Sequence, residues 1–202
     1  MLSLIDQKRI EDTVSEVEKT TSGEIKVVVV DESTSYQRAH LRSGILIALF
    51  AVFFKIPDYH QMGLLFIQVP LFVLGYLICF YGPIKTFFLL QHEMDEEVHK
   101  RCMQAFLENN LHTTSERTGI LIFASVIEQK VVILADTGIN EKVENGMWQK
   151  IVDGLIEDIK KKNLTSGLLG AVFKCGDILS EHFPAKDNNP NELSDKPQFS
   201  KK

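Results

Sequence analysis

Two runs without a charged residue constrain the fold of this 202-residue chain more than any other feature. The first covers residues 43–54 and the second residues 62–84. A helix needs roughly 20 apolar residues to cross the ~30 Å hydrocarbon layer of a membrane. The second run reaches this length, and the first does so if it includes Leu41 and Ile56 while the ammonium of Lys55 extends to the interface.

The sequence therefore predicts a transmembrane helical hairpin at residues 41–88, with its helices at about 41–56 and 62–84. Pro57 favours a turn between them. Two alternatives stay open, namely a buried helical hairpin in a soluble core and a re-entrant hairpin that enters the bilayer and returns.

The charges around the hairpin predict its orientation, because positive residues collect on the cytoplasmic side of a membrane. Lys55 is the only basic residue between the two runs, whereas five flank the hairpin: Arg38, Arg42, Lys85, Lys100 and Arg101. We expect two crossings with both termini in the cytoplasm, at a bacterial inner membrane. The lack of a signal-peptide pattern at the N-terminus and the three widely spaced cysteines Cys79, Cys102 and Cys175, read as reduced buried thiols, agree with a reducing compartment.

The flanks of the hairpin have the pattern of an α/β domain. Strands are expected at 25–30, 119–124 and 131–135, the last two as a hairpin, and helices at 4–20, 93–110, 148–162 and from a cap at Thr165 onward. One helix and one strand cannot bury a core alone, so residues 1–38 and 90–184 are predicted to form a single split domain. Its fold class is α/β, a small mixed sheet flanked by helices and interrupted by the hairpin. The polar segment 185–202 is predicted to be a disordered tail.

The residues of the flanks also carry a resemblance. The segments are Ser22–Val27, Arg117–Ile122, Lys130–Ile133, Ala135–Ile139, Trp148, Gly167–Leu168, His182–Pro184 and Asn191–Asp195. In this order and spacing they resemble the TPM domain family, named after a thylakoid lumen phosphatase, a photosystem II repair protein and a nematode acetylcholine-receptor modulator. The resemblance implies an α/β sandwich around a small sheet. It also implies a choice of roles, since some members are described as acid phosphatases, some bind calcium, and others assist the assembly of membrane proteins.

Four residues form the candidate ligand or phosphate site: Glu24, Arg117, Asp136 and Gly138. Asp136 follows a strand, where a carboxylate can face a ligand crevice, and Gly138 permits a tight turn there. Arg117 has the guanidinium geometry that binds phosphate or carboxylate. Calcium or magnesium prefers oxygen ligands, so Asp136, Glu24 and Asp31 are the candidate metal ligands. The competing interpretation is that Asp136 only caps its loop and that Arg117 forms an ion pair with Glu116 or with a neighbouring helix.

Two functions follow as hypotheses. The first is a membrane-anchored, non-catalytic accessory or assembly module, with the lipid bilayer and other membrane proteins as partners. The second is a metal-assisted acid phosphatase acting on phosphomonoesters, with its catalytic residues unassigned. A net charge of -5 argues against nucleic acid as a partner, because the chain has no basic excess to displace counterions from phosphates.

Overall fold

The computed structural model describes residues 3–53, 61–144, 146–161, 163–186 and 191–200, and gives the backbone alone at 51–53, 61–65 and 82–83. The chain divides into two compact units. Unit 1 comprises residues 1–33 and 95–202, and unit 2 comprises residues 34–94. The hairpin is thus an insertion into a domain formed by both flanks of the chain.

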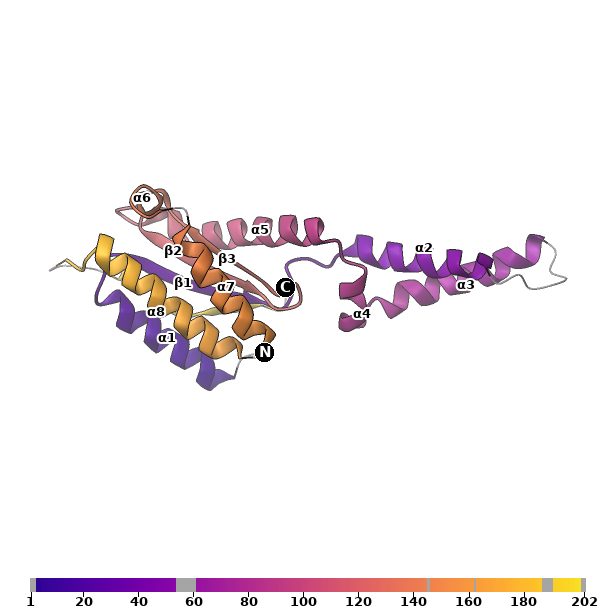
Figure 1. The fold of residues 1–202 in the computed structure, drawn as a ribbon, viewed down its shortest axis with the longest axis horizontal. Helices are drawn as coiled ribbons and strands as arrows, with labels where there is room; N and C mark the ends of the chain where they lie inside the picture. The colour runs from indigo at the N-terminus through magenta and orange to yellow at the C-terminus, as the bar shows by residue number, and fades with distance from the viewer. Residues whose placement is uncertain (1–2, 54–60, 145, 162, 187–190, 201–202) are drawn as a thin grey trace. The chain divides into compact units, whose positions relative to one another are not determined.

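Unit 1 is built on a four-stranded mixed sheet in the order β3-β2-β1-β4 (Figure 1). Its strands are β1 (Glu24–Val30), β2 (Gly119–Ser125), β3 (Lys130–Ala135) and β4 (Gln198–Ser200). β1 is parallel to both β2 and β4, and β2 is antiparallel to β3. Every residue of β1 and β2 is buried, as expected for strands that are covered on both faces.

Helices cover both faces of this sheet (Figure 1). One face packs against α1 (Leu4–Glu18), α7 (Met147–Lys160) and α8 (Leu164–His182). The other face packs against α5 (Gln91–Glu108) and the short η1 (Leu111–Thr113). Because successive side chains of a strand point to opposite faces, Val27 belongs to the first core and Val28 to the second. The predicted α/β class with a small mixed sheet flanked by helices is confirmed.

Local sequence explains where the first helix begins and how it packs. The hydroxyl of Ser3 accepts a hydrogen bond from the backbone N–H of Asp6, and the Asp6 carboxylate accepts one from the N–H of Ser3. This capping box satisfies amide groups that the first helical turn leaves without partners. Further along, the absence of a side chain at Gly176 of α8 lets Val17 of α1 approach closely, since a Cβ there would lie 2.1 Å from Val17 Cγ1.

Two local predictions need correction. Residues 137–140 form the short helix α6 (Thr137–Asn140) rather than a loop. The N-cap of α8 is Asn163 rather than Thr165, so the helix begins before the predicted cap.

The prediction of a disordered tail at 185–202 is wrong for the residues 191–200 that the structure describes. We call Asn191–Ser200 the C-terminal strap. Its last three residues, Gln198–Ser200, form β4. Leu193 packs against the core on the face of the sheet that α5 covers, which we call the α5-side core. The strap is polar, so its composition predicts disorder, but its order comes from contacts with residues more than 150 positions away.

Unit 2 contains a helical hairpin of α2 (Gln37–Phe53) and α3 (Gln61–Ile78), followed by α4 (Gly82–Phe87). The second apolar run is therefore not one helix to residue 84, although Pro70 is accommodated inside α3. Residues 54–60, which include most of the predicted turn, lie outside the described residues.

The two hairpin helices approach closely where both have small residues. The Ser43 hydroxyl donates a hydrogen bond to the Gly75 carbonyl over 2.8 Å, and a Cβ at Gly75 would lie 2.8 Å from the Ser43 carbonyl oxygen. Gly44 packs in the same way against Phe72. Ser43 and Gly44 of the first run and Gly75 of the second thus serve contact within the hairpin, the same role that small residues have between membrane helices.

Over the residues that the structure describes, no helix combines the length and the apolar character needed to cross a bilayer. The helical hairpin is present at the predicted place, but its transmembrane nature is not confirmed.

The three cysteines are free and buried, as predicted. Burial raises the pKa of Cys102 and of Cys175 to about 12, so both thiols stay protonated at neutral pH.

Candidate functional site

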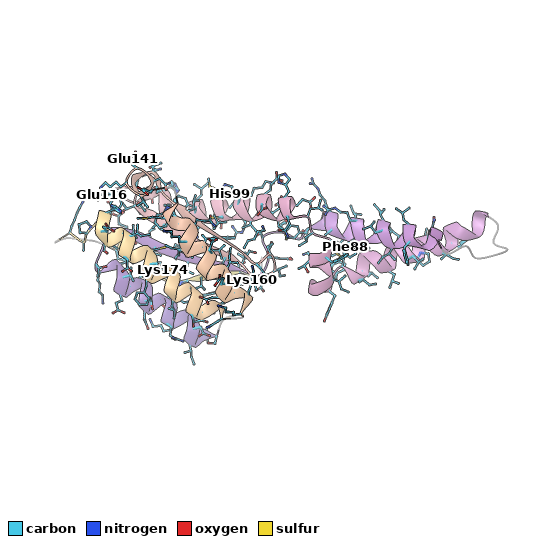
Figure 2. All side chains as sticks on the ribbon, viewed as in Figure 1. Phe88, His99, Glu116, Glu141, Lys160 and Lys174 are labelled. Carbon is cyan, nitrogen blue, oxygen red and sulfur yellow. The ribbon has the colours of Figure 1, made fainter. Side chains whose placement is uncertain are left out.

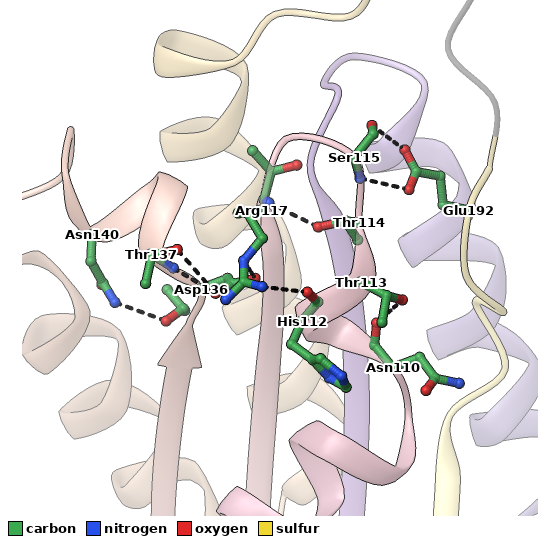
Figure 3. Close-up of polar contacts among 12 residues, drawn as sticks. Asn110, His112, Thr113, Thr114, Ser115, Arg117, Asp136, Thr137, Asn140 and Glu192 are labelled. Carbon is green, nitrogen blue, oxygen red and sulfur yellow. Dashed lines mark hydrogen bonds and ion pairs between the residues drawn. The ribbon is translucent and has the colours of Figure 1, made fainter.

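The structure brings Arg117 and Asp136 together in an ion pair (Figure 3). Arg117 Nε lies 2.9 Å from Asp136 Oδ2, and the two side chains differ in exposure, 50% for Arg117 and 4% for Asp136. The guanidinium also donates from Nη1 to the carbonyl of His112 over 2.8 Å. The buried carboxylate is therefore neutralised by an arginine that stays open to solvent on one side.

Strand pairing explains why these two residues meet. β3 runs antiparallel to β2, so the end of β3 lies beside the beginning of β2, and the Asp136 N–H donates to the Gly119 carbonyl over 2.9 Å. Arg117 precedes β2 in a left-handed conformation with φ 59°. Gly138 completes the arrangement, because a Cβ there would lie 2.4 Å from the Glu116 carbonyl oxygen.

The second carboxylate oxygen of Asp136 has a structural task. Oδ1 accepts a hydrogen bond from the backbone N–H of Thr137 over 2.7 Å and so caps α6. Asn140 closes the same turn by donating to the Ala135 carbonyl over 2.8 Å. Of the competing interpretations, the cap at Asp136 is present. The ion pair of Arg117 is with Asp136 rather than with Glu116, which pairs with Lys186 instead.

Glu24 is engaged by the C-terminal strap rather than by Asp136. Its two carboxylate oxygens accept hydrogen bonds from the N–H groups of Glu192, over 3.0 Å, and Leu193, over 3.3 Å. Glu192 in turn accepts from both the N–H and the hydroxyl of Ser115, over 2.9 and 2.6 Å (Figure 3). Burial raises the pKa of the Glu24 carboxyl, and the two amide donors oppose that rise.

The candidate metal ligands are not assembled into one site. Glu24 begins β1 and Asp31 follows its end, so a seven-residue strand separates them, about 20 Å at 3.3 Å per residue. Asp136 is paired with Arg117, whose positive charge opposes a cation at the same carboxylate. Among the described residues, no three His, Cys, Asp or Glu side chains are grouped as metal ligands.

Two buried charged residues near Glu24 were missed by sequence reasoning. Glu18 ends α1 with 8% exposure, and Lys26 lies within β1 with 7% exposure. Lys26 Nζ donates to the carbonyls of Ser194 and Lys196 over 2.6 and 2.8 Å. The sequence did offer one indication of this, because a lysine lies inside the β-branched run 25–30. A strand covered on both faces does not tolerate a lysine unless its ammonium has a partner.

A cavity of about 390 Å³ lies at the same end of unit 1. It is lined by Ser15, Glu18, Lys19, Glu24, Ala185, Lys186 and Asn191. Desolvation raises the pKa of the Glu18 carboxyl to about 8, well above its usual 4.5. Its Oε1 accepts from the Ile25 N–H over 2.7 Å, while Oε2 has no partner among the described residues.

Comparison with known families identifies the domain type. Residues 84–178 match the TPM domain family. The match begins in unit 2, includes β2, β3 and the Arg117–Asp136 pair, and ends within α8. The resemblance inferred from the sequence is therefore confirmed, and the structure adds α1, β1 and the C-terminal strap to the same unit.

The overall fold is similar to that of the BA42 protein from the psychrophilic bacterium Bizionia argentinensis, which was solved by NMR. The TM-score is 0.62 at 21% sequence identity, and the similarity covers 98% of this chain and 95% of BA42. At 21% identity, this similarity shows that the two proteins share a fold and shows nothing about a shared role. No curated protein matches the chain.

Proposed function

We propose that this TPM-domain protein is anchored to a lipid bilayer by its α2–α3 hairpin and that unit 1 acts as a non-catalytic accessory module for other membrane proteins. The bilayer would be a bacterial inner membrane with both termini on its cytoplasmic side. The observation that carries the proposal is the apolar surface of the hairpin.

This surface consists of large side chains that the hairpin leaves outside its own core. Phe50 is 63% exposed in α2, Phe66 is 80% exposed in α3, and Phe80 after α3 is 68% exposed. Side chains project outward from both helices (Figure 2). Val69 is also 63% exposed, and others with exposure near one half are Ile45, Leu46, Leu49, Val73, Leu74 and Leu77. An exposed apolar surface of this extent is characteristic of protein or membrane contact sites.

The contacts of Arg42 and Lys85, which flank the two apolar runs, support the same proposal. Arg42 Nη1 donates to the Phe88 carbonyl over 2.9 Å, and Nη2 pairs with the Glu93 carboxylate. Lys85 is buried with its ammonium over the Tyr36 ring, 5.3 Å from the centroid. Arg42 and Lys85 thus lie at the outer ends of the two apolar runs, where the basic residues that flank membrane segments are found.

The anchoring is tested by flotation of the purified full chain with phosphatidylcholine–phosphatidylglycerol vesicles. We expect the wild-type chain to float and a variant with Leu46, Phe50, Val73 and Leu77 all replaced by Ser to lose at least about a hundredfold in partition, because each exposed apolar side chain contributes transfer free energy. The matched control replaces Val126, Met147 and Phe173, which are exposed in unit 1, by Ser. Equal flotation of the hairpin variant and this control would rule out the anchor.

The alternative, a metal-assisted phosphatase, has weaker support from the candidate residues. Arg117 and Asp136 neutralise each other, and Glu24 holds the strap. None of the three is therefore available without rearrangement to bind an ion or steady a phosphoryl group.

We expect the full chain to show no metal-dependent hydrolysis of a generic phosphomonoester. The assay compares the wild type with Asp136→Asn, with and without Ca²⁺ or Mg²⁺. Turnover that requires the metal and disappears in Asp136→Asn would contradict the non-catalytic assignment. Equal turnover of both proteins indicates a contaminating enzyme.

A further inference from the structure

We propose that the edge of β1 covered by the C-terminal strap is a docking site for a peptide segment, and that the strap is its tethered occupant. The partner segment would carry an acidic residue followed by leucine and would run parallel to β1. This inference rests on the proposed binding role and names the surface that performs it.

The first argument is that buried charges of β1 hold the strap by its main chain. Glu24 accepts from the N–H groups of Glu192 and Leu193, and Lys26 donates to the carbonyls of Ser194 and Lys196. Both charged side chains are more than nine-tenths buried. A carboxylate for amide groups and an ammonium for carbonyl groups recognise the main chain of a segment that bends at Leu193, whatever its side chains are.

The second argument is that a few side-chain contacts supply sequence preference. Leu193 packs partly buried against the α5-side core, and Glu192 accepts two hydrogen bonds from Ser115. Asn109 donates to the Gln198 side chain over 3.0 Å. A competing peptide must therefore reproduce the acidic residue and the leucine that follows it.

The third argument concerns how firmly the strap is held. β4 has three residues, and they pair with Val28, Val29 and Val30 while staying partly exposed. The strap covers the buried charges of Glu24 and Lys26, but its two large apolar side chains, Leu193 and Phe199, are only partly buried. Segments with few buried apolar contacts open locally without global unfolding, so we expect the strap to detach while the β1–β2–β3 sheet stays intact.

The test measures binding of a fluorescent synthetic peptide of residues 191–202 to the full chain by anisotropy. The trans peptide competes with the resident strap, so its apparent affinity follows the fraction of chains with an open edge. Leu193→Ala weakens the resident strap and leaves the β1 edge unchanged. We expect the peptide to bind this variant about tenfold more tightly than it binds the wild type.

Two controls isolate the edge. Leu169→Ala removes a leucine of similar burial from α8, packed against the opposite core, and should not change the affinity. A peptide N-methylated at the positions of Glu192 and Leu193 cannot donate to Glu24, and we expect it to bind the Leu193→Ala chain at least about tenfold more weakly. Equal affinity of the wild type and Leu193→Ala, or no binding to either, would overturn the proposal.

A measurement on the wild-type chain alone covers the case in which Leu193→Ala does not fold. Hydrogen exchange at the amides of Glu192 and Leu193 should be at least about a hundredfold faster than at the β2 amides, because the strap opens by itself. Exchange at equal rates would mean that the strap leaves only on global unfolding. Both experiments use purified protein without lipid, so their failure removes this surface and leaves membrane anchoring to the flotation test.

Discussion

Raising the pH from about 5 to about 9 is expected to lower the free energy of unfolding by about 4 kcal/mol through Glu18 alone. Desolvation raises the pKa of this carboxyl from 4.5 to about 8 in the folded chain. Between these values the folded protein keeps the proton and the unfolded chain releases it. Stability from this group is therefore full below about pH 4.5, falls as the pH rises, and reaches its minimum above about pH 8.

The measurement is urea unfolding at several pH values, monitored by the fluorescence of Trp148. This single tryptophan packs against the core between the sheet and helices α1, α7 and α8. Glu18→Gln keeps an oxygen that can accept from the Ile25 N–H but has no proton to lose. We expect this variant to be more stable than the wild type above pH 8 and to lose most of the pH dependence. Glu16→Gln, at an exposed position on the same helix, is the matched control. A pH profile of Glu18→Gln that parallels the wild type would contradict the prediction.

Gly138→Ala is expected to lower the free energy of unfolding by about 3 kcal/mol. Its Cβ would lie 2.4 Å from the Glu116 carbonyl oxygen and 2.8 Å from that of Arg117. These are backbone atoms, which cannot rotate away as a flexible side chain can. Because Gly138 does not have a positive φ, the expected loss is steric rather than conformational.

The same urea titration checks this prediction, with Gly170→Ala as the control. Gly170 lies inside α8 with open space around it, so alanine there should raise stability by about 0.5 to 1 kcal/mol. If α6 shifts to admit the new methyl group, the Arg117–Asp136 ion pair is also lost. Equal stability of Gly138→Ala and Gly170→Ala would show that α6 accommodates the methyl group without strain.

The sequence predicts most elements of unit 1 because their signals are local. The capping box of Ser3 and Asp6, the β-branched run at 25–30 and the helical spacing of Ile151, Leu155 and Ile159 each lie within a few turns or one strand. The elements form where these patterns predict. The hairpin insertion was also predictable, since each of the two charge-free runs between β1 and α5 favours a helix.

The candidate site was predicted in part. Arg117, Asp136 and Gly138 converge because β2 and β3 form the predicted antiparallel hairpin, which brings the start of one strand beside the end of the other. Glu24 begins the neighbouring parallel strand, but its carboxylate serves the strap. Which oxygen meets which donor depends on distances of a few ångström, and strand order alone does not fix these.

The amino-acid sequence by itself determined the α/β class, the split domain and the inserted helical hairpin, because periodicity and caps act between near neighbours. The resemblance to TPM domains rested separately on the order and spacing of segments along the flanks. The tertiary structure decided the fate of the polar strap and of Glu18, Glu24 and Lys26. The strap is ordered by charged groups about 168 residues away in the chain, and the cost of burying those charges is offset by the main-chain groups that the strap supplies. A lysine inside a buried strand signals that a partner exists, but no local pattern identifies that partner, since the strap is an ordinary polar segment until the fold brings the two together.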